Sequence, residues 1–247
     1  MEKNPEQEWL KKYNEKKQLL TSPVDFNQYF TEKEMCGKKL FHLEMGNVSF
    51  PTGNVIVCDP LVYISRKIKP YFVQTPTGTF PLTTLVAEVE KDYYRYVAVQ
   101  VKFTDNKAVN YIEALKGTED LDGLEEGEYF GFNVDAGLAT VIDTATRDAY
   151  CDFEDEWRKE NTDGNVYDDF FADEFKKSYE QNPQFQRKGG DWINFNIPNT
   201  NLNIPMIQSG FGDGSYPVYF GYDADNKICE LVIQFIDIEL AFGEKEE

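Results

Sequence analysis

Alternating polar and apolar residues run through much of the chain beyond about residue 40. Over 96–103, valine or phenylalanine occupies every second position, with a tyrosine, an alanine, a glutamine and a lysine between them. This period of two is typical of a strand that buries one face. Glycines and prolines interrupt the segments between 46 and 81, which predicts short strands joined by turns.

Two further strand pairs are predicted from the turns that separate them. Residues 216–238 hold two apolar runs on either side of the polar segment 223–227, which indicates a hairpin near the end of the chain. Segments 129–134 and 138–142 flank the turn Asp135-Ala136-Gly137, and we expect these two segments to pair as well.

Two other segments have helical spacing. Residues 6–20 begin with acids and continue with lysines, an order that matches the helix dipole. Over 144–182, alanines and aromatic residues recur every three or four positions and acids lie between them. This pattern predicts a helical segment whose aromatic face packs on the sheet and whose acids face solvent.

These elements predict an α+β fold that is mainly antiparallel β, in a sheet or a sandwich. We expect an N-terminal helical extension over 1–40 and one β-rich domain over 41–243, with a helical insertion at about 144–182. The length of 247 residues is sufficient for one large core.

The charge balance narrows the classes of partner. The chain has 44 acidic and 25 basic residues, a formal net charge of −19. Such a surface repels nucleic acids and anionic membranes, and it attracts divalent cations or a basic partner protein. Solubility alone is the competing explanation.

Cysteine usage and the start of the sequence bear on location. The four cysteines have no zinc-site spacing and no C-x-x-C motif, and Met1–Pro5 is charged with no apolar stretch after it. We therefore expect four free thiols and a cytoplasmic protein with no membrane span.

Familiar catalytic motifs are missing from the sequence. His42 is the one histidine, and the G-x-S-x-G and H-E-x-x-H motifs do not occur. The glycine-rich string Gly210–Ser215 precedes a strand and has no lysine after it, so a phosphate loop is excluded and a sharp turn is expected. We accordingly lean away from an enzyme and expect no organic cofactor.

Aspartates at strand ends are the candidate ligand or metal residues: Asp59, Asp135, Asp143 and Asp213. If the strand ends converge, these carboxylates would suit Ca²⁺ or Mg²⁺, which prefer oxygen ligands. The alternative is that each aspartate caps a helix or a turn by bonding to nearby backbone.

Acids are densest in two stretches. Residues 119–128 hold six acids and no base, and residues 143–174 hold twelve acids and three bases. Acidic residues beside aromatic side chains are suited to bind a basic protein. The partner-binding candidates in the second stretch are Asp168, Asp169, Asp173 and Glu174. A solvated outer helical face is the alternative explanation.

Several ordered strings resemble a bacterial family called domain of unknown function 4241, over about residues 45–240. The strings are Pro51-Thr52-Gly53, Cys58-Asp59-Pro60-Leu61, Pro76–Pro81, Arg95-Tyr96-Val97-Ala98, Val134-Asp135-Ala136-Gly137 with Asp143, and Ser209–Gly221. The resemblance implies a mainly β fold and carries no activity or catalytic residue with it.

Two hypotheses about function follow. The first is an acidic protein-binding module of the bacterial immunity or antitoxin type. The second is a divalent-cation-dependent hydrolase or small-ligand-binding domain that uses the clustered aspartates.

Overall fold

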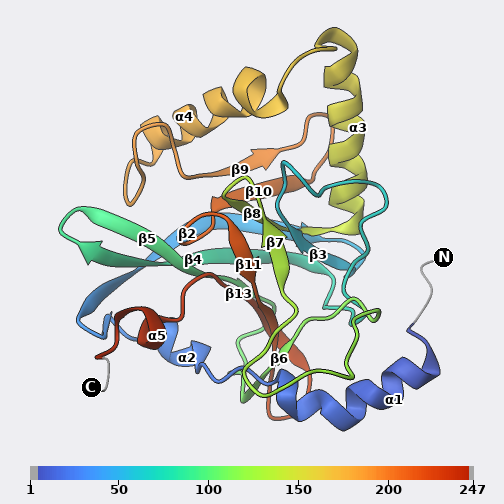
Figure 1. Cartoon of the computed structure of the whole chain (residues 1–247). Helices are drawn as coiled ribbons and strands as arrows, with labels where there is room; N and C mark the ends of the chain where they lie inside the picture. The colour runs from blue at the N-terminus through green and yellow to red at the C-terminus, as the bar shows by residue number, and fades with distance from the viewer. Residues whose placement is uncertain (1–4, 245–247) are drawn as a thin grey trace.

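A seven-stranded antiparallel sheet occupies the centre of the protein in a computed structural model that describes residues 5–244 (Figure 1). The strands follow the order β1-β2-β4-β5-β13-β12-β6, and all neighbours are antiparallel. They span Glu34–Met35 (β1), Lys38–Phe50 (β2), Gly78–Glu90 (β4), Tyr93–Lys102 (β5), Asn110–Glu113 (β6), Val218–Tyr222 (β12) and Ile228–Gln234 (β13). The predicted C-terminal hairpin is β12 and β13, joined through the turn at 223–227.

Two smaller antiparallel sheets accompany the large one. A four-stranded sheet has the order β3-β8-β10-β9, and β7 pairs with β11. They span Val55–Cys58 (β3), Phe132–Val134 (β7), Leu138–Asp143 (β8), Trp192–Asn196 (β9), Asn203–Gln208 (β10) and Gly214–Tyr216 (β11). The predicted pairing of 129–134 with 138–142 is wrong, because the turn between these segments carries the chain from one sheet into another.

The helices lie at the two ends of the molecule in Figure 1, with α3 and α4 at the top and α1, α2 and α5 at the bottom. They span Gln7–Lys16 (α1), Phe26–Tyr29 (α2), Thr144–Glu160 (α3), Ala172–Gln181 (α4) and Ile238–Phe242 (α5). A 3-10 turn, η1 (Lys17–Leu20), extends α1, and a π-helical turn, η2 (Tyr167–Phe171), precedes α4. The fold is thus α+β and mainly antiparallel β, with an N-terminal helix and a helical insertion, as predicted.

The N-terminal segment packs on the β-rich part of the chain. The Trp9 indole N–H donates to the carbonyl oxygen of Glu119 at 2.9 Å, and Thr21 forms a β-bridge to Ile112 on the edge strand β6. Residue 40, the expected boundary of the extension, lies inside β2. The charged segment 1–4 falls outside the described residues.

Two apolar cores hold the sheets and helices together. One core covers the seven-stranded sheet, where Val97, Val99 and Val101 of β5 are fully buried. Tyr96 and Ala98 on the other face of β5 are buried too, so the centre of this strand is covered on both faces. The second core lies between the four-stranded sheet and the helical insertion.

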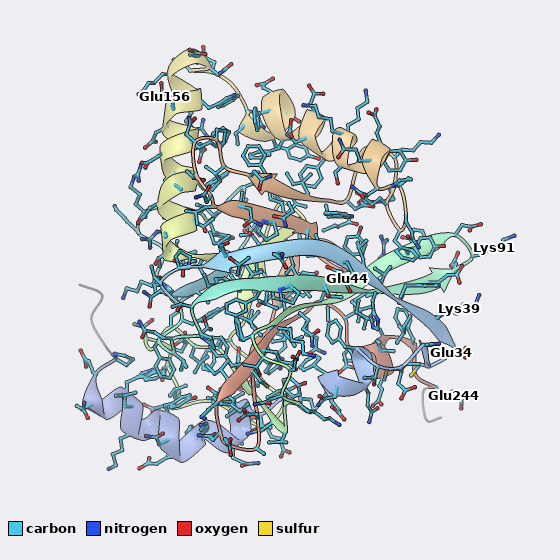
Figure 2. All side chains as sticks on the ribbon, turned by 180° about the vertical axis from the view of Figure 1, so that it is seen from behind. Glu34, Lys39, Glu44, Lys91, Glu156 and Glu244 are labelled. Atoms are coloured by element: carbon cyan, nitrogen blue, oxygen red, sulfur yellow. The ribbon has the colours of Figure 1, made fainter. Side chains whose placement is uncertain are left out.

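The aromatic residues of the insertion face this second core, as the spacing predicts. Phe171 and Phe175 are buried, whereas Asp168 and Asp173 are exposed. Charged side chains elsewhere also point outward, and Figure 2 shows Glu156 on the outer side of α3 and Lys91 at the β4–β5 turn. All four cysteines are free thiols, and no helix within residues 5–244 is long and apolar enough to cross a membrane.

Phe171 gives a direct test of the second core. Its ring is fully buried and contacts Tyr150, Phe153 and Phe195. Phe171→Ala should lower the free energy of unfolding by roughly 3–5 kcal/mol, the usual cost of truncating a core phenylalanine. Urea denaturation measures the change.

The matched control is Tyr167→Ala one helical turn earlier, because the Tyr167 side chain is 37% exposed. That variant should lose about 1 kcal/mol or less. Equal losses in the two variants would contradict the packing described for the insertion.

Candidate functional site: an acidic pocket around Glu113

Asp59 is a buried structural carboxylate at the end of β3. One oxygen accepts the backbone N–H of Leu61 at 2.9 Å. The other accepts the N–H groups of Asp135 and Ala136 at 3.0 and 2.6 Å. Asp59 therefore joins the loop after β3 to the turn before β8, which brings Asp59 and Asp135 together.

Asp143 is also fully buried and caps α3. Its carboxylate accepts the N–H of Ala145 at 2.8 Å, together with the N–H groups of Thr52 and Gly53 at 3.0 and 2.9 Å. Since Asp143 ends β8 while the Asp135 turn precedes it, the strand holds these two aspartates apart.

Asp135 and Asp213 are exposed. The hydroxyl of Tyr63 donates to Asp135, and Asp213 lies in the glycine-rich turn before β11. No three His, Cys, Asp or Glu side chains within the described part of the chain are placed to hold a metal ion. The hydrogen bonds that Asp59 and Asp143 accept from the backbone correspond to the capping and turn roles given above as the alternative. A Ca²⁺ or Mg²⁺ site at the four aspartates stays a prediction.

The acids of the insertion lie on η2 and α4. Asp168, Asp169 and Asp173 are exposed, and Glu174 is half-buried in an ion pair with Lys177 at 2.6 Å. Asp169 accepts the backbone N–H of Asn165 at 2.8 Å, which closes the turn before the helix. These four side chains form a solvated outer surface, and none of them lines a cavity described below.

A pocket of about 850 Å³ lies at the opposite end of the molecule from α4. Its walls come from three places that are distant in sequence: the η1 turn, the acid-rich loop at 126–129, and the region where β11, β12 and β13 meet α5. Glu113, the last residue of β6, belongs to its lining and is only 2% exposed.

The two oxygens of Glu113 have different surroundings. Oε1 accepts the backbone N–H groups of Phe130 and Gly131, each at 2.8 Å. Oε2 is buried and has no hydrogen-bond partner within residues 5–244. A buried carboxylate oxygen without a donor is costly, so a donor or a cation that reached this atom would be stabilised by it.

Burial raises the pKa of Glu113 to about 7, although the two backbone N–H groups act in the opposite direction. Tyr219 stands directly opposite Glu113 on β12 and also lines the pocket. Burial, and to a lesser extent the charge of Glu113, raises the pKa of the Tyr219 hydroxyl. A titratable group with a shifted pKa in a pocket is typical of a functional site.

Seven other lining residues are acidic or aromatic. Glu126, Glu128 and Asp237 add three carboxylates, and the lining includes no lysine, arginine or histidine. Aromatic rings also face the pocket: Tyr129, Tyr216, Tyr219 and Phe235. Carboxylates and aromatic faces both attract organic cations, so the arrangement suits an ammonium or a guanidinium group.

Sequence reasoning missed Glu113 but found part of its surroundings. Glu126 and Glu128 belong to the acid-dense stretch at 119–128, whose last three residues line the pocket. Glu113 itself stands within Tyr111-Ile112-Glu113-Ala114-Leu115, a single acid in an apolar run. An acid in such a run is expected to be buried, and this position in the sequence could have identified Glu113 as a candidate.

Comparison with known proteins yields one family. A family model described as "Protein of unknown function (DUF4241)" matches residues 48–233. No curated protein and no solved structure matches the chain. The matched range contains Glu113, Asp59, Asp135 and Asp143.

The structural role of Asp59 can be measured by unfolding. Asp59→Ala removes the buried acceptor of three backbone N–H groups, those of Leu61, Asp135 and Ala136, and each lost hydrogen bond costs about 1 kcal/mol. We expect a loss of several kcal/mol in chemical denaturation. Asp213→Ala, at an exposed turn, is the control and should change stability by about 0.5 kcal/mol or less. A mild Asp59→Ala effect would contradict the role assigned to this carboxylate.

Glu113 should make stability fall as pH rises. Its pKa is raised from 4.5 to about 7 in the folded protein, so the folded state binds more protons between these values. This contribution to stability is therefore complete below about pH 4.5 and is lost as pH rises through 7, by roughly 3 kcal/mol in all.

Glu113→Gln isolates this effect, because the amide oxygen still accepts the two N–H groups but does not titrate. The melting temperature of the variant minus that of the wild type should increase steadily from pH 5 to pH 8. A constant difference across this range would show that Glu113 does not titrate near neutral pH.

Proposed function

This chain belongs to the DUF4241 family, and we propose that it is an acidic binding module that receives a cationic side chain of a basic partner in the Glu113 pocket. The observation that carries the proposal is Glu113 itself: its buried Oε2 atom lacks a donor, and the residue lines a pocket that holds no basic residue.

The chemistry of the pocket supports an arginine or a lysine as the bound group. A guanidinium or ammonium group supplies the missing hydrogen bond and the opposite charge at one point. Its aliphatic stem packs against aromatic rings such as Tyr129 and Tyr219. Binding of the cation also favours the ionised form of Glu113, so a proton leaves as the ligand enters.

The charge of the whole chain supports fast association with such a partner. A net charge of −19 attracts a basic protein over distances longer than direct contact. Bacterial immunity and antitoxin proteins, acting in the cytoplasm on a basic toxin, are the biological class that this proposal favours.

A matched pair of small ligands tests the pocket. Nα-acetyl-arginine amide should bind and shift the backbone amide resonances of Gly127 and Tyr129, whereas the neutral citrulline analogue should not. The affinity for the arginine amide should rise between pH 6 and pH 8 as Glu113 ionises. Two-dimensional NMR titration measures the shifts and the affinity together.

Charge reversals on two surfaces locate the binding site. Glu126→Lys with Asp237→Lys should weaken arginine-amide binding by about tenfold or more, since two nearby charges change sign. Asp168→Lys with Asp173→Lys, on the far helices, changes the net charge equally and should leave the affinity unchanged at moderate salt.

Three results would contradict the proposal. The citrulline analogue could bind as well as the arginine amide, both charge reversals could weaken arginine-amide binding equally, or only the helical variant could lose this binding. The same variants serve as baits for affinity capture from the native cell. A partner that the pocket variant loses and the helical variant keeps identifies the physiological ligand.

A further inference from the structure

The backbone of Phe130 and Gly131, whose N–H groups bind Glu113, also lines a second pocket of about 440 Å³. This pocket lies where β3 ends and β7 begins, and Cys58 and Phe132 contribute to its wall. The loop that follows β3 supplies another wall through Tyr63, Ser65 and Lys67.

The charge of the second pocket is opposite to that of the chain. Lys67 and Lys116 both line it, and no Asp or Glu does. Within the described residues neither lysine side chain forms an ion pair or a hydrogen bond. Two unpaired lysines at one cavity are unexpected in a chain where acids outnumber bases by 44 to 25.

The backbone that carries Lys116 is held in place. The carboxylate of Glu119 accepts the N–H groups of Lys116, Gly117 and Thr118 at 2.6, 2.9 and 2.9 Å. Lys116 is half-buried, so its side chain has less freedom than an exposed lysine. A fixed cation binds an anion with a smaller loss of conformational entropy.

The opposite wall is held by the aspartates that the sequence singled out. Asp59 bonds to the backbone of Leu61, at the start of the loop that carries Lys67, and to that of Asp135 and Ala136, just after β7. The exposed carboxylate of Asp135 then accepts the hydroxyl of Tyr63, which keeps this ring at the cavity. Asp59 and Asp135 thus position the loop that carries Lys67.

We propose that this pocket binds a small organic anion, with a phosphate or carboxylate group between Lys67 and Lys116 and a flat apolar body against Phe130 and Phe132. Ser65 and Asn133 supply further polar groups at the lining. A volume of about 440 Å³ suits a small metabolite, and mixed polar and aromatic walls are typical of such sites. This site is separate from the cationic ligand proposed above.

Phenyl phosphate is the probe, with benzoate as the carboxylate counterpart and phenol as the neutral control. Calorimetry on the full chain should detect phenyl phosphate at millimolar or lower concentration and should not detect phenol. Inorganic phosphate should bind more weakly than phenyl phosphate, because it lacks the ring. In NMR spectra the amides of Ser65 and Asn133 should shift, while Gln18 in the Glu113 pocket should not.

Four lysine variants test the two cations. Lys67→Gln and Lys116→Gln should each weaken phenyl phosphate binding about tenfold or more, since each removes a charge-assisted hydrogen bond. Lys69→Gln removes an exposed lysine outside the lining and should leave the affinity unchanged. Lys116→Arg keeps the charge and should retain most of the affinity, which separates loss of charge from loss of fold.

The proposal is overturned if no anion of the panel binds, if phenol binds as well as phenyl phosphate, or if the three Lys→Gln variants bind alike. Shifts confined to residues outside the second pocket would overturn it too. A preference for benzoate over phenyl phosphate supports the site and identifies its ligand as a carboxylate.

Discussion

The fold depends on one constraint: most of its buried carboxylates have no basic side chain as a partner. Six acidic residues are buried within the described residues: Asp59, Glu113, Asp143, Asp191, Asp223 and Glu230. Among these, only Asp191 has a basic partner, Arg187. The others bind backbone N–H groups or neutral side chains, so that the loops fold around the carboxylates. In this acid-rich chain, backbone N–H groups stabilise the buried carboxylates, a role that lysine and arginine side chains have in other proteins.

This constraint explains why the two pockets lie where they do. β6 is the edge strand of the seven-stranded sheet, and after its last residue the described chain forms only two further backbone bonds nearby, from Ala114 to Val218 and from Phe72 to Leu115. Side chains hold the segments that follow. Glu113 binds the returning segment at 130–131, and Glu119 binds the outgoing segment at 116–118. The space that these irregular segments leave uncovered forms both cavities.

Regular periodicity made most of the architecture predictable. The helical insertion and the first helix each follow a repeat that one face of the helix buries. The hairpin β12–β13 follows two apolar runs across a polar turn, and both of its strands are buried on both faces. The pairing of 129–134 with 138–142 failed because a short turn indicates where the chain reverses but not which sheet each strand joins. That choice rests on the contact between Asp59 and the turn, which links residues far apart in the chain.

The candidate sites were less predictable for the same reason. The acid-rich loop at 119–128 was found as a charged segment, but the position of its last three residues at a pocket depends on where β6 and η1 lie. The strand-end aspartates were interpreted as ligands or as caps, and two of them, Asp59 and Asp143, act as caps. Lys67 and Lys116 come from separate loops, and no local pattern connects them.

Gly131 has a consequence for how this family can evolve. It has φ of +60°, and a Cβ atom there would lie 2.7 Å from the carbonyl oxygen of Tyr216. Because its backbone lines one cavity and binds the Glu113 carboxylate of the other, a mutation at this position affects both at once. Selection on either cavity therefore acts on the other, and relatives that diverge in one ligand are expected to inherit this short segment intact.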